Sequence, residues 1–127
     1  MNGVTYDTGA LIAAERESSR SIWRLHRRLL ERGTHPTLPT VVLGQAWRGG
    51  PQARLSQLVH GCLIEPFTEQ QARAAGLALA ASGGSDLVDA AVVITALARD
   101  DLVVTSDPDD LRRIAAAIGH DLTVHVV

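Results

Sequence analysis

The sequence of 127 residues contains a single cysteine, Cys62, and no lysine, since all twelve basic side chains are arginine. One cysteine cannot form an internal disulfide, which favours an intracellular protein. The missing lysine excludes every mechanism that depends on an amine side chain. No signal peptide is found, and charged residues interrupt each apolar stretch before it reaches the length of a membrane span. We therefore expect a cytoplasmic protein without membrane contact.

Aromatic residues are also scarce, at 3% of the chain, whereas hydrophobic residues of all kinds make up 46%. The core is therefore expected to consist of Ala, Val, Leu and Ile side chains. The length suits one domain over residues 1–127 and leaves no room for two. The net charge of −2 excludes a bulk polycation, so any binding of nucleic acid requires a local basic patch.

Short β-branched runs alternate with helical patterns along the whole chain. Strands are expected at residues 4–6, 62–64, 102–105 and 122–127, and a strand or turn is expected around residue 37. Helices are expected at residues 7–17, 19–33, 40–47, 51–61, 68–81, 85–99 and 107–119. Local signals support several helix starts: Ser19 as an N-cap, Pro51 at a first helical position, and a capping box of Thr68 with Gln71.

This alternation predicts an α/β domain of three layers, with a central, mostly parallel sheet flanked by helices. In such domains the ligand crevice lies beyond the carboxyl ends of the strands. Asp7 follows the first strand and Asp107 follows a later one, so both are expected on the crevice side. Asp86 and Asp89 lie three apart on one helix and therefore share a face. The rest of that helix is apolar and is expected in the domain centre.

Simpler roles exist for some of these carboxylates. Asp107 before Pro108 suits a helix cap, and Asp86 lies where the helix dipole favours an anion. Neither role explains Asp89, which the predicted boundaries place a full turn inside an apolar helix. Crowded carboxylates repel one another unless a cation is present. Ligands that are all oxygen favour Mg²⁺ or Mn²⁺.

Three segments in this order resemble those of a known family. Residues 4–12, with Asp7, are similar to the opening of a PIN domain. Residues 86–93 are similar to its central acidic helix, and residues 103–111 to its later strand and Thr-x-Asp turn. The order and spacing match over nearly the whole chain, and the length suits the VapC toxins of that family.

The resemblance implies a PIN-like domain that is a metal-dependent endoribonuclease and the toxin of a type II toxin–antitoxin pair. It implies that Asp7, Asp89 and Asp107 hold Mg²⁺ or Mn²⁺ and act in catalysis on an RNA substrate, with Asp86 or Asp110 assisting. The expected protein partner is a separately encoded antitoxin. The tryptophans Trp23 and Trp47 are expected in packing or in a dimer interface, and we expect a homodimer.

Gln45 departs from the family pattern, because many relatives carry a glutamate at this place. A glutamine offers a carbonyl oxygen but no negative charge, and Gln45 is equally compatible with a solvent-facing position. This departure keeps open an alternative, a catalytically weak or inactive PIN-like protein that only binds a partner. Two other enzyme classes are disfavoured: a phosphoacceptor receiver domain needs a lysine, and a dehalogenase-type phosphatase needs an aspartate where Gly9 stands.

The second predicted helix has a basic face. Its five arginines could contact RNA or an antitoxin, or they could form an ordinary solvated helix face; they are Arg20, Arg24, Arg27, Arg28 and Arg32.

Overall fold

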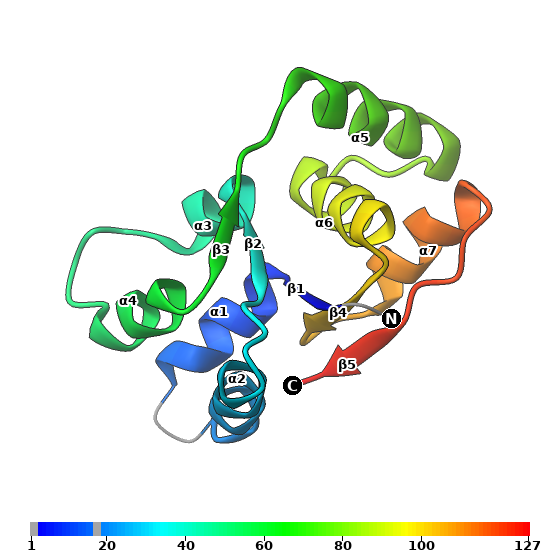
Figure 1. Ribbon diagram of the computed structural model, residues 1–127. Helices are drawn as coiled ribbons and strands as arrows, with labels where there is room; N and C mark the ends of the chain where they lie inside the picture. Colours follow the sequence, from blue (N-terminus) through cyan, green and yellow to red (C-terminus); the bar gives the residue numbers. More distant parts are fainter. Residues whose placement is uncertain (1–2, 17–18) are drawn as a thin grey trace.

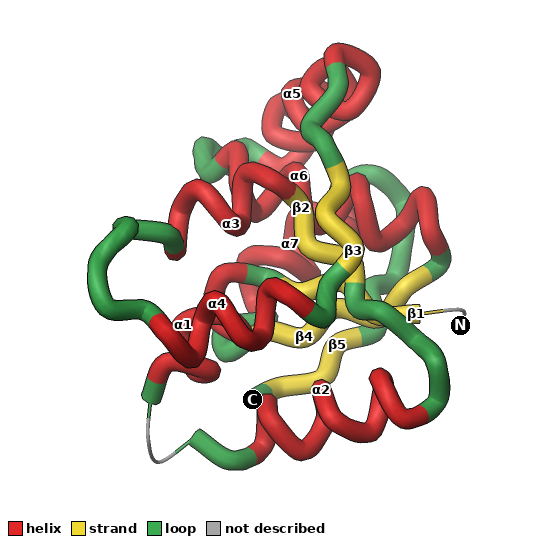
Figure 2. The backbone as a smooth tube through the Cα atoms, turned by 60° about the vertical axis from the view of Figure 1, so that its left-hand side comes forward, coloured by secondary structure: helices red, strands yellow, loops and turns green. Residues whose placement is uncertain are grey.

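The computed structural model describes residues 3–16 and 19–127 (Figures 1 and 2). Its centre is a five-stranded sheet in the order β3-β2-β1-β4-β5, and all neighbouring strands are parallel. The strands are β1 Gly3–Tyr6, β2 Thr37–Pro39, β3 Leu63–Glu65, β4 Asp101–Thr105 and β5 Val124–Val126. The helices are α1 Thr8–Glu15, α2 Ser21–Glu31, α3 Thr40–Ala46, α4 Ala53–His60, α5 Glu69–Ser82, α6 Leu87–Arg99 and α7 Asp109–Ala117.

The helices form two groups around the sheet. In Figure 1, α1, α2 and α4 lie on one side of it, whereas α5, α6 and α7 are packed together on the other. The predicted three-layer α/β domain with a parallel sheet is therefore confirmed. Among the described residues, no single helix is long and apolar enough to cross a membrane, and only the strongly bent pair α5 and α6 passes such a test together.

The core is aliphatic, as the composition predicts. Tyr6 is the only aromatic side chain that is fully buried among the described residues, and Ile22, Leu38, Val93 and Val103 are typical of its neighbours in the core. Burying one such aliphatic side chain contributes about 1.5–3 kcal/mol. These contacts hold α1 and α6 against β1 and β4, the two strands that carry acidic residues at their ends.

Several helix boundaries differ from the prediction. The helix α2 begins at Ser21 with Arg20 at its N-cap, so Ser19 is not the cap. The helix α4 begins at Ala53, two residues after Pro51. The expected end of α1 at Glu17 lies outside the described residues, and the helix ends at Glu15. At α2 and α4 the local signals thus predict the helix start only to within two residues.

The capping box of α5 is confirmed. The Gln71 backbone N–H donates to Thr68 Oγ1 over 3.2 Å, and the Thr68 N–H donates to Gln71 Oε1 over 2.9 Å.

His26 lies in the middle of α2 and is buried. Its Nδ1 forms a hydrogen bond with the Tyr6 hydroxyl at 2.8 Å, which ties α2 to β1. Burial lowers the pKa of His26, so the ring is neutral near pH 7.

Candidate active site

Asp7 follows β1 directly, and its side chain lies in a largely buried place. The residue is only 7% exposed. Its backbone N–H donates to the Val104 carbonyl over 3.0 Å, which continues the pairing of β1 with β4. Asp7 therefore lies at the carboxyl edge of the sheet, where the topology predicts a ligand crevice.

Thr105 links the ends of these two strands through one buried hydroxyl. Its Oγ1 donates to Asp7 Oδ2 over 2.8 Å and accepts from the Asp107 backbone N–H over 3.1 Å. The hydroxyl thereby fixes the orientation of the Asp7 carboxylate and the start of the following turn. The sequence pattern indicates Thr105 only as part of the Thr-x-Asp turn and does not predict this positioning role.

Gly9 allows the first turn of α1 to approach the loop after β4. A Cβ atom at this position would lie 2.8 Å from the Ser106 backbone nitrogen, a distance that real Cβ atoms do not adopt. The absence of a side chain at Gly9 is thus required for the close approach of the two acidic strand ends.

Asp86 and Asp89 lie at the start of α6. Asp86 is the N-cap, and its Oδ1 accepts from the Asp89 backbone N–H over 3.1 Å. Asp86 therefore lies at the helix start, where the dipole favours an anion, and also caps the helix. Asp89 is not a full turn inside the helix as expected, because α6 begins at Leu87 rather than at Ser85.

The pKa of Asp89 is raised from 3.8 to about 7, first of all by burial. Four other carboxylates raise it further, in this order: Asp86, Asp7, Asp110 and Asp107. A carboxylate in the first turn of a helix would ordinarily be stabilised by the dipole. Its raised pKa therefore reports, besides burial, a crowd of negative charge around this side chain.

Burial also raises the pKa of Asp7, and the carboxylates of Asp86 and Asp107 add to the effect. Hydrogen bonds from the Thr105 hydroxyl and the Thr8 backbone N–H act in the opposite direction. The predicted acidic residues thus share one electrostatic environment.

Asp107 and Asp110 lie on the exposed side of this group. Asp107 does not cap α7, because the N-cap is Pro108 and no side-chain hydrogen bond is present there, so the alternative cap role of Asp107 is wrong. Asp110 forms an ion pair with Arg113 at 2.8 Å, one turn further along α7. Asp107 is therefore available to a ligand, whereas Asp110 is already paired.

Comparison with known proteins was informative only at the level of structure. No protein-family model and no curated protein matches the sequence. A chain from the structure of VapBC2 of Rickettsia felis, bound to a DNA fragment from the promoter, is similar over 98% of both chains, with 16% identity and a TM-score of 0.74. A chain of a toxin–antitoxin complex from Klebsiella pneumoniae is similar over 85% of this chain and 89% of its own, with 16% identity and a TM-score of 0.63. The chain has a PIN-like fold.

Within the PIN-like fold, Gln45 lies at the margin of the acidic group. It is an exposed residue of α3, and its Oε1 accepts a hydrogen bond from the Thr8 hydroxyl. The Thr8 backbone N–H in turn interacts with the Asp7 carboxylate. Gln45 is therefore connected to Asp7 through one intervening residue.

The donor set of this acidic group suits a hard divalent cation, because it consists of carboxylate oxygens that repel one another. Among the described residues, no three His, Cys, Asp or Glu side chains already stand in a metal-binding arrangement. The residues fit Mg²⁺ or Mn²⁺ in charge and chemistry, but their side chains would have to move to hold such an ion.

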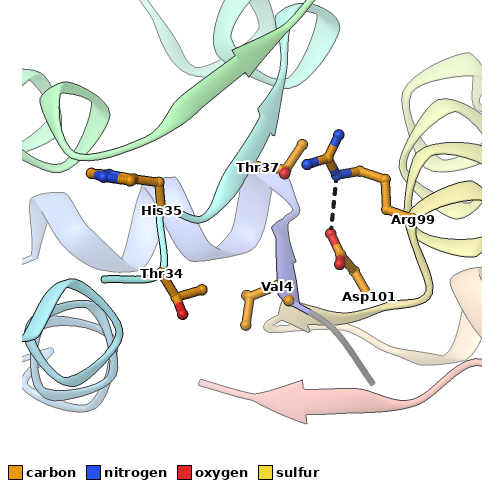
Figure 3. A pocket seen from close by; sticks show the side chains of 7 residues that line it. Val4, Thr34, His35, Thr37, Arg99 and Asp101 are labelled. Atoms are coloured by element: carbon orange, nitrogen blue, oxygen red, sulfur yellow. Dashed lines mark ion pairs between the residues drawn. The ribbon is translucent and has the colours of Figure 1, made fainter. Parts of the chain in front are cut away.

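A separate cavity of about 330 Å³ lies at the opposite, amino-terminal end of β1 and β4 (Figure 3). Its polar wall is an ion pair in which Arg99 Nε lies 3.5 Å from Asp101 Oδ2. The Thr5 hydroxyl also donates to Asp101 Oδ2 over 3.0 Å. Since these groups satisfy one another, this cavity has a structural role and does not belong to the acidic site.

Proposed function

We propose that this protein is a Mg²⁺- or Mn²⁺-dependent endoribonuclease, the VapC-type toxin of a type II toxin–antitoxin pair, acting in the cytoplasm on RNA phosphodiester bonds. The observation that carries the proposal is the group of carboxylates at the ends of β1 and β4 and the start of α6, where Asp7 is only 7% exposed and where neighbouring carboxylates, after burial, raise the pKa of Asp89. A protein gains no stability from such repulsion, so a ligand that neutralises it is expected. The structural similarity to toxin–antitoxin complexes supports the same conclusion.

Asp7, Asp89 and Asp107 would hold the cation, and Asp86 would support Asp89 from the N-cap of α6. A divalent cation bound there supplies positive charge for the phosphodiester and lowers the pKa of an attacking water. Without it, these carboxylates would repel the phosphate backbone. Thr105 orients Asp7, because its hydroxyl donates to Asp7 Oδ2.

An aspartate, or hydroxide supplied by the cation, would accept the proton of the attacking water. None of the five histidines is among the groups that shift the pKa of Asp7 or Asp89.

The proposed partners are an antitoxin chain and a second copy of this protein. Trp47 is 43% exposed. It lines a mostly apolar hollow of about 360 Å³ together with Leu43 and Val59. Such a hollow fits an apolar side chain of a partner.

A second candidate is a catalytically weak or inactive PIN-like protein that only binds its partner. Gln45 in place of a glutamate and the absence of a ready-made three-ligand group in residues 3–16 and 19–127 favour this candidate. Calorimetric titration with Mg²⁺ and Mn²⁺ separates the two, because an inactive scaffold has no reason to keep a metal site.

The experiment that tests the proposal is expression of the protein with and without the product of a neighbouring gene, followed by mapping of new RNA 5′ ends. We expect growth arrest and new 5′ ends for the wild type, and neither effect for Asp7→Asn or for co-expression with the antitoxin. Growth arrest without new 5′ ends would contradict the nuclease. A strictly monomeric protein with no protein partner would contradict the toxin.

A further inference from the structure

Four arginine side chains surround one hollow on the side of the molecule formed by α1, α2 and α4. The hollow has a volume of about 310 Å³, and we call it the arginine hollow; it is lined by Ser19, Arg20, Trp23, Arg24, Arg27 and Arg54. All four arginines are exposed. The protein as a whole carries a net charge of −2, so this local concentration of positive charge is not a consequence of composition.

The positive charge of the arginine hollow is not neutralised within the described part of the chain. The ion pairs found among residues 3–16 and 19–127 involve Arg73, Arg99 and Arg113, which lie elsewhere. Arg54 is oriented by a backbone group, because its Nη1 lies 3.4 Å from the Arg16 carbonyl oxygen. Its charge therefore remains available to a ligand.

The arginines reduce the stability of α2. Arg20 and Arg24 lie four residues apart and Arg24 and Arg27 lie three apart, and each like-charged pair costs about 0.2–0.5 kcal/mol. Positive charge near a helix N-terminus is also unfavourable because of the helix dipole, and the first turn of α2 contains no acidic residue that could offset it. The start of α2 thus has two features that destabilise a helix, namely like-charged neighbours and positive charge near its N-terminus. Such departures from the stabilising pattern are expected at functional sites.

The arginine hollow lies one helix length from the acidic site. α1 begins immediately after Asp7 and comprises eight residues, which corresponds to about 12 Å. At its far end, Trp23 Nε1 donates to the Ala14 carbonyl oxygen over 3.0 Å, which attaches the hollow to α1. Figure 1 shows α1 extending from the end of β1 toward α2. This separation corresponds to the length of a few nucleotides.

We infer that the arginine hollow binds the phosphodiester backbone of single-stranded RNA a few nucleotides away from the bond that is cut. The inference rests on the proposed function, because it takes RNA as the ligand. Guanidinium groups bind phosphate oxygens in a bidentate manner, and several together form a groove that follows a backbone. This anchor provides the attraction to RNA that the acidic site, with its own negative charge, does not.

The test compares Arg24→Gln/Arg27→Gln with the matched control Arg32→Gln/Arg73→Gln, which removes the same charge outside the arginine hollow. Glutamine has a helix propensity close to that of arginine, so both variants are expected to fold. Binding of a fluorescent single-stranded RNA is measured in EDTA, where no cleavage occurs, over a series of salt concentrations. Each phosphate contact contributes about 0.7 to the slope of log affinity against log salt for a single strand.

For the hollow variant Arg24→Gln/Arg27→Gln we expect the magnitude of this slope to fall by about 1.4 and the affinity for RNA near physiological salt to fall about tenfold. The control variant should change little in either quantity. Equal slopes in the wild type and the hollow variant would overturn the inference, as would an equal loss in the control. Stronger binding of a polyglutamate peptide than of RNA would also overturn it, in favour of an acidic protein partner. Absence of Mg²⁺-dependent cleavage with the slope difference intact would refute the nuclease and leave the arginine hollow supported.

Discussion

The metal-free protein should become less stable as the pH rises, and Asp89 should be the main cause. Its pKa in the folded protein is about 7, compared with the ordinary value of 3.8. Because the folded state holds this proton more tightly than the unfolded chain does, the stabilising contribution is complete below about pH 4. It is lost as the pH rises through about 7.

The size of the effect follows from the same values. The difference between 3.8 and about 7 corresponds to a ceiling of about 4 kcal/mol. Asp89 is partly exposed and shares the negative field with its neighbours, so we expect about 2 kcal/mol of lost stability between about pH 5 and about pH 8.

Urea unfolding in EDTA at these two pH values measures the loss. Asp89→Asn keeps the backbone N–H that bonds to Asp86 and mimics the protonated form, so its stability should change by about 2 kcal/mol less than that of the wild type. Asp109→Asn is the control, because this exposed residue of α7 is not among the groups that raise the pKa of Asp89. The lowered pKa of His26 acts equally in all three proteins and cancels.

Saturating Mg²⁺ at about pH 8 should restore the stability of the wild type and have a much smaller effect on Asp89→Asn. The same pH dependence in the wild type and in Asp89→Asn would refute the reasoning, since it would mean that burial and the neighbouring carboxylates do not raise the pKa of Asp89 in the folded protein.

Substitutions at three further positions, each with a matched control, test the geometry of the site. Gly9→Ala should destabilise the protein by about 1–3 kcal/mol in urea unfolding, because the added methyl group meets the Ser106 backbone. Gly44→Ala in α3 is the control, since a methyl group there meets nothing within 4 Å and should be neutral or stabilising. Equal effects of the two substitutions would contradict the contact between Gly9 and Ser106. Thr105→Val should raise the pKa of Asp7 and strongly reduce RNA cleavage, whereas Thr105→Ser keeps the hydroxyl and should retain activity. The measurement is the pH dependence of RNA cleavage by the two variants. Full activity of the valine variant would exclude the positioning role of Thr105. Gln45→Glu should tighten Mg²⁺ binding in a calorimetric titration and Gln45→Ala should change it little, while unchanged affinity in Gln45→Glu would place this residue outside the metal site.

The strands are predictable from the sequence because they depend on local pattern. The location of the acidic residues at one edge of the sheet is predictable because it follows from a general rule of parallel sheets. The β-branched runs around Val4 and Val103 identify β1 and β4. Since the carboxyl ends of parallel strands lie at one edge, the sequence alone predicts that Asp7 and Asp107 lie on the same side of the sheet.

The features that the sequence does not predict depend on contacts between distant residues. The Thr105 hydroxyl bonds to a carboxylate 98 positions earlier in the chain, and nothing near Thr105 indicates this. His26 is buried where its ring meets the Tyr6 hydroxyl, a contact that its sequence neighbours do not indicate. The sequence pattern also places the start of α6 two residues too early, which makes Asp89 look deeper in the helix than it is.

The most direct test of the central claim is RNA cleavage by the purified protein with Mg²⁺ or Mn²⁺ and with EDTA, beside Asp7→Asn prepared in the same way. Asp7 is the most buried of the acidic residues at this site and is held by Thr105, so its amide variant should fold normally while losing the charge that a cation requires. The account predicts cleavage by the wild type only with a divalent cation, and none by Asp7→Asn under any condition. Cleavage in EDTA, or cleavage by Asp7→Asn at the rate of the wild type, would contradict it.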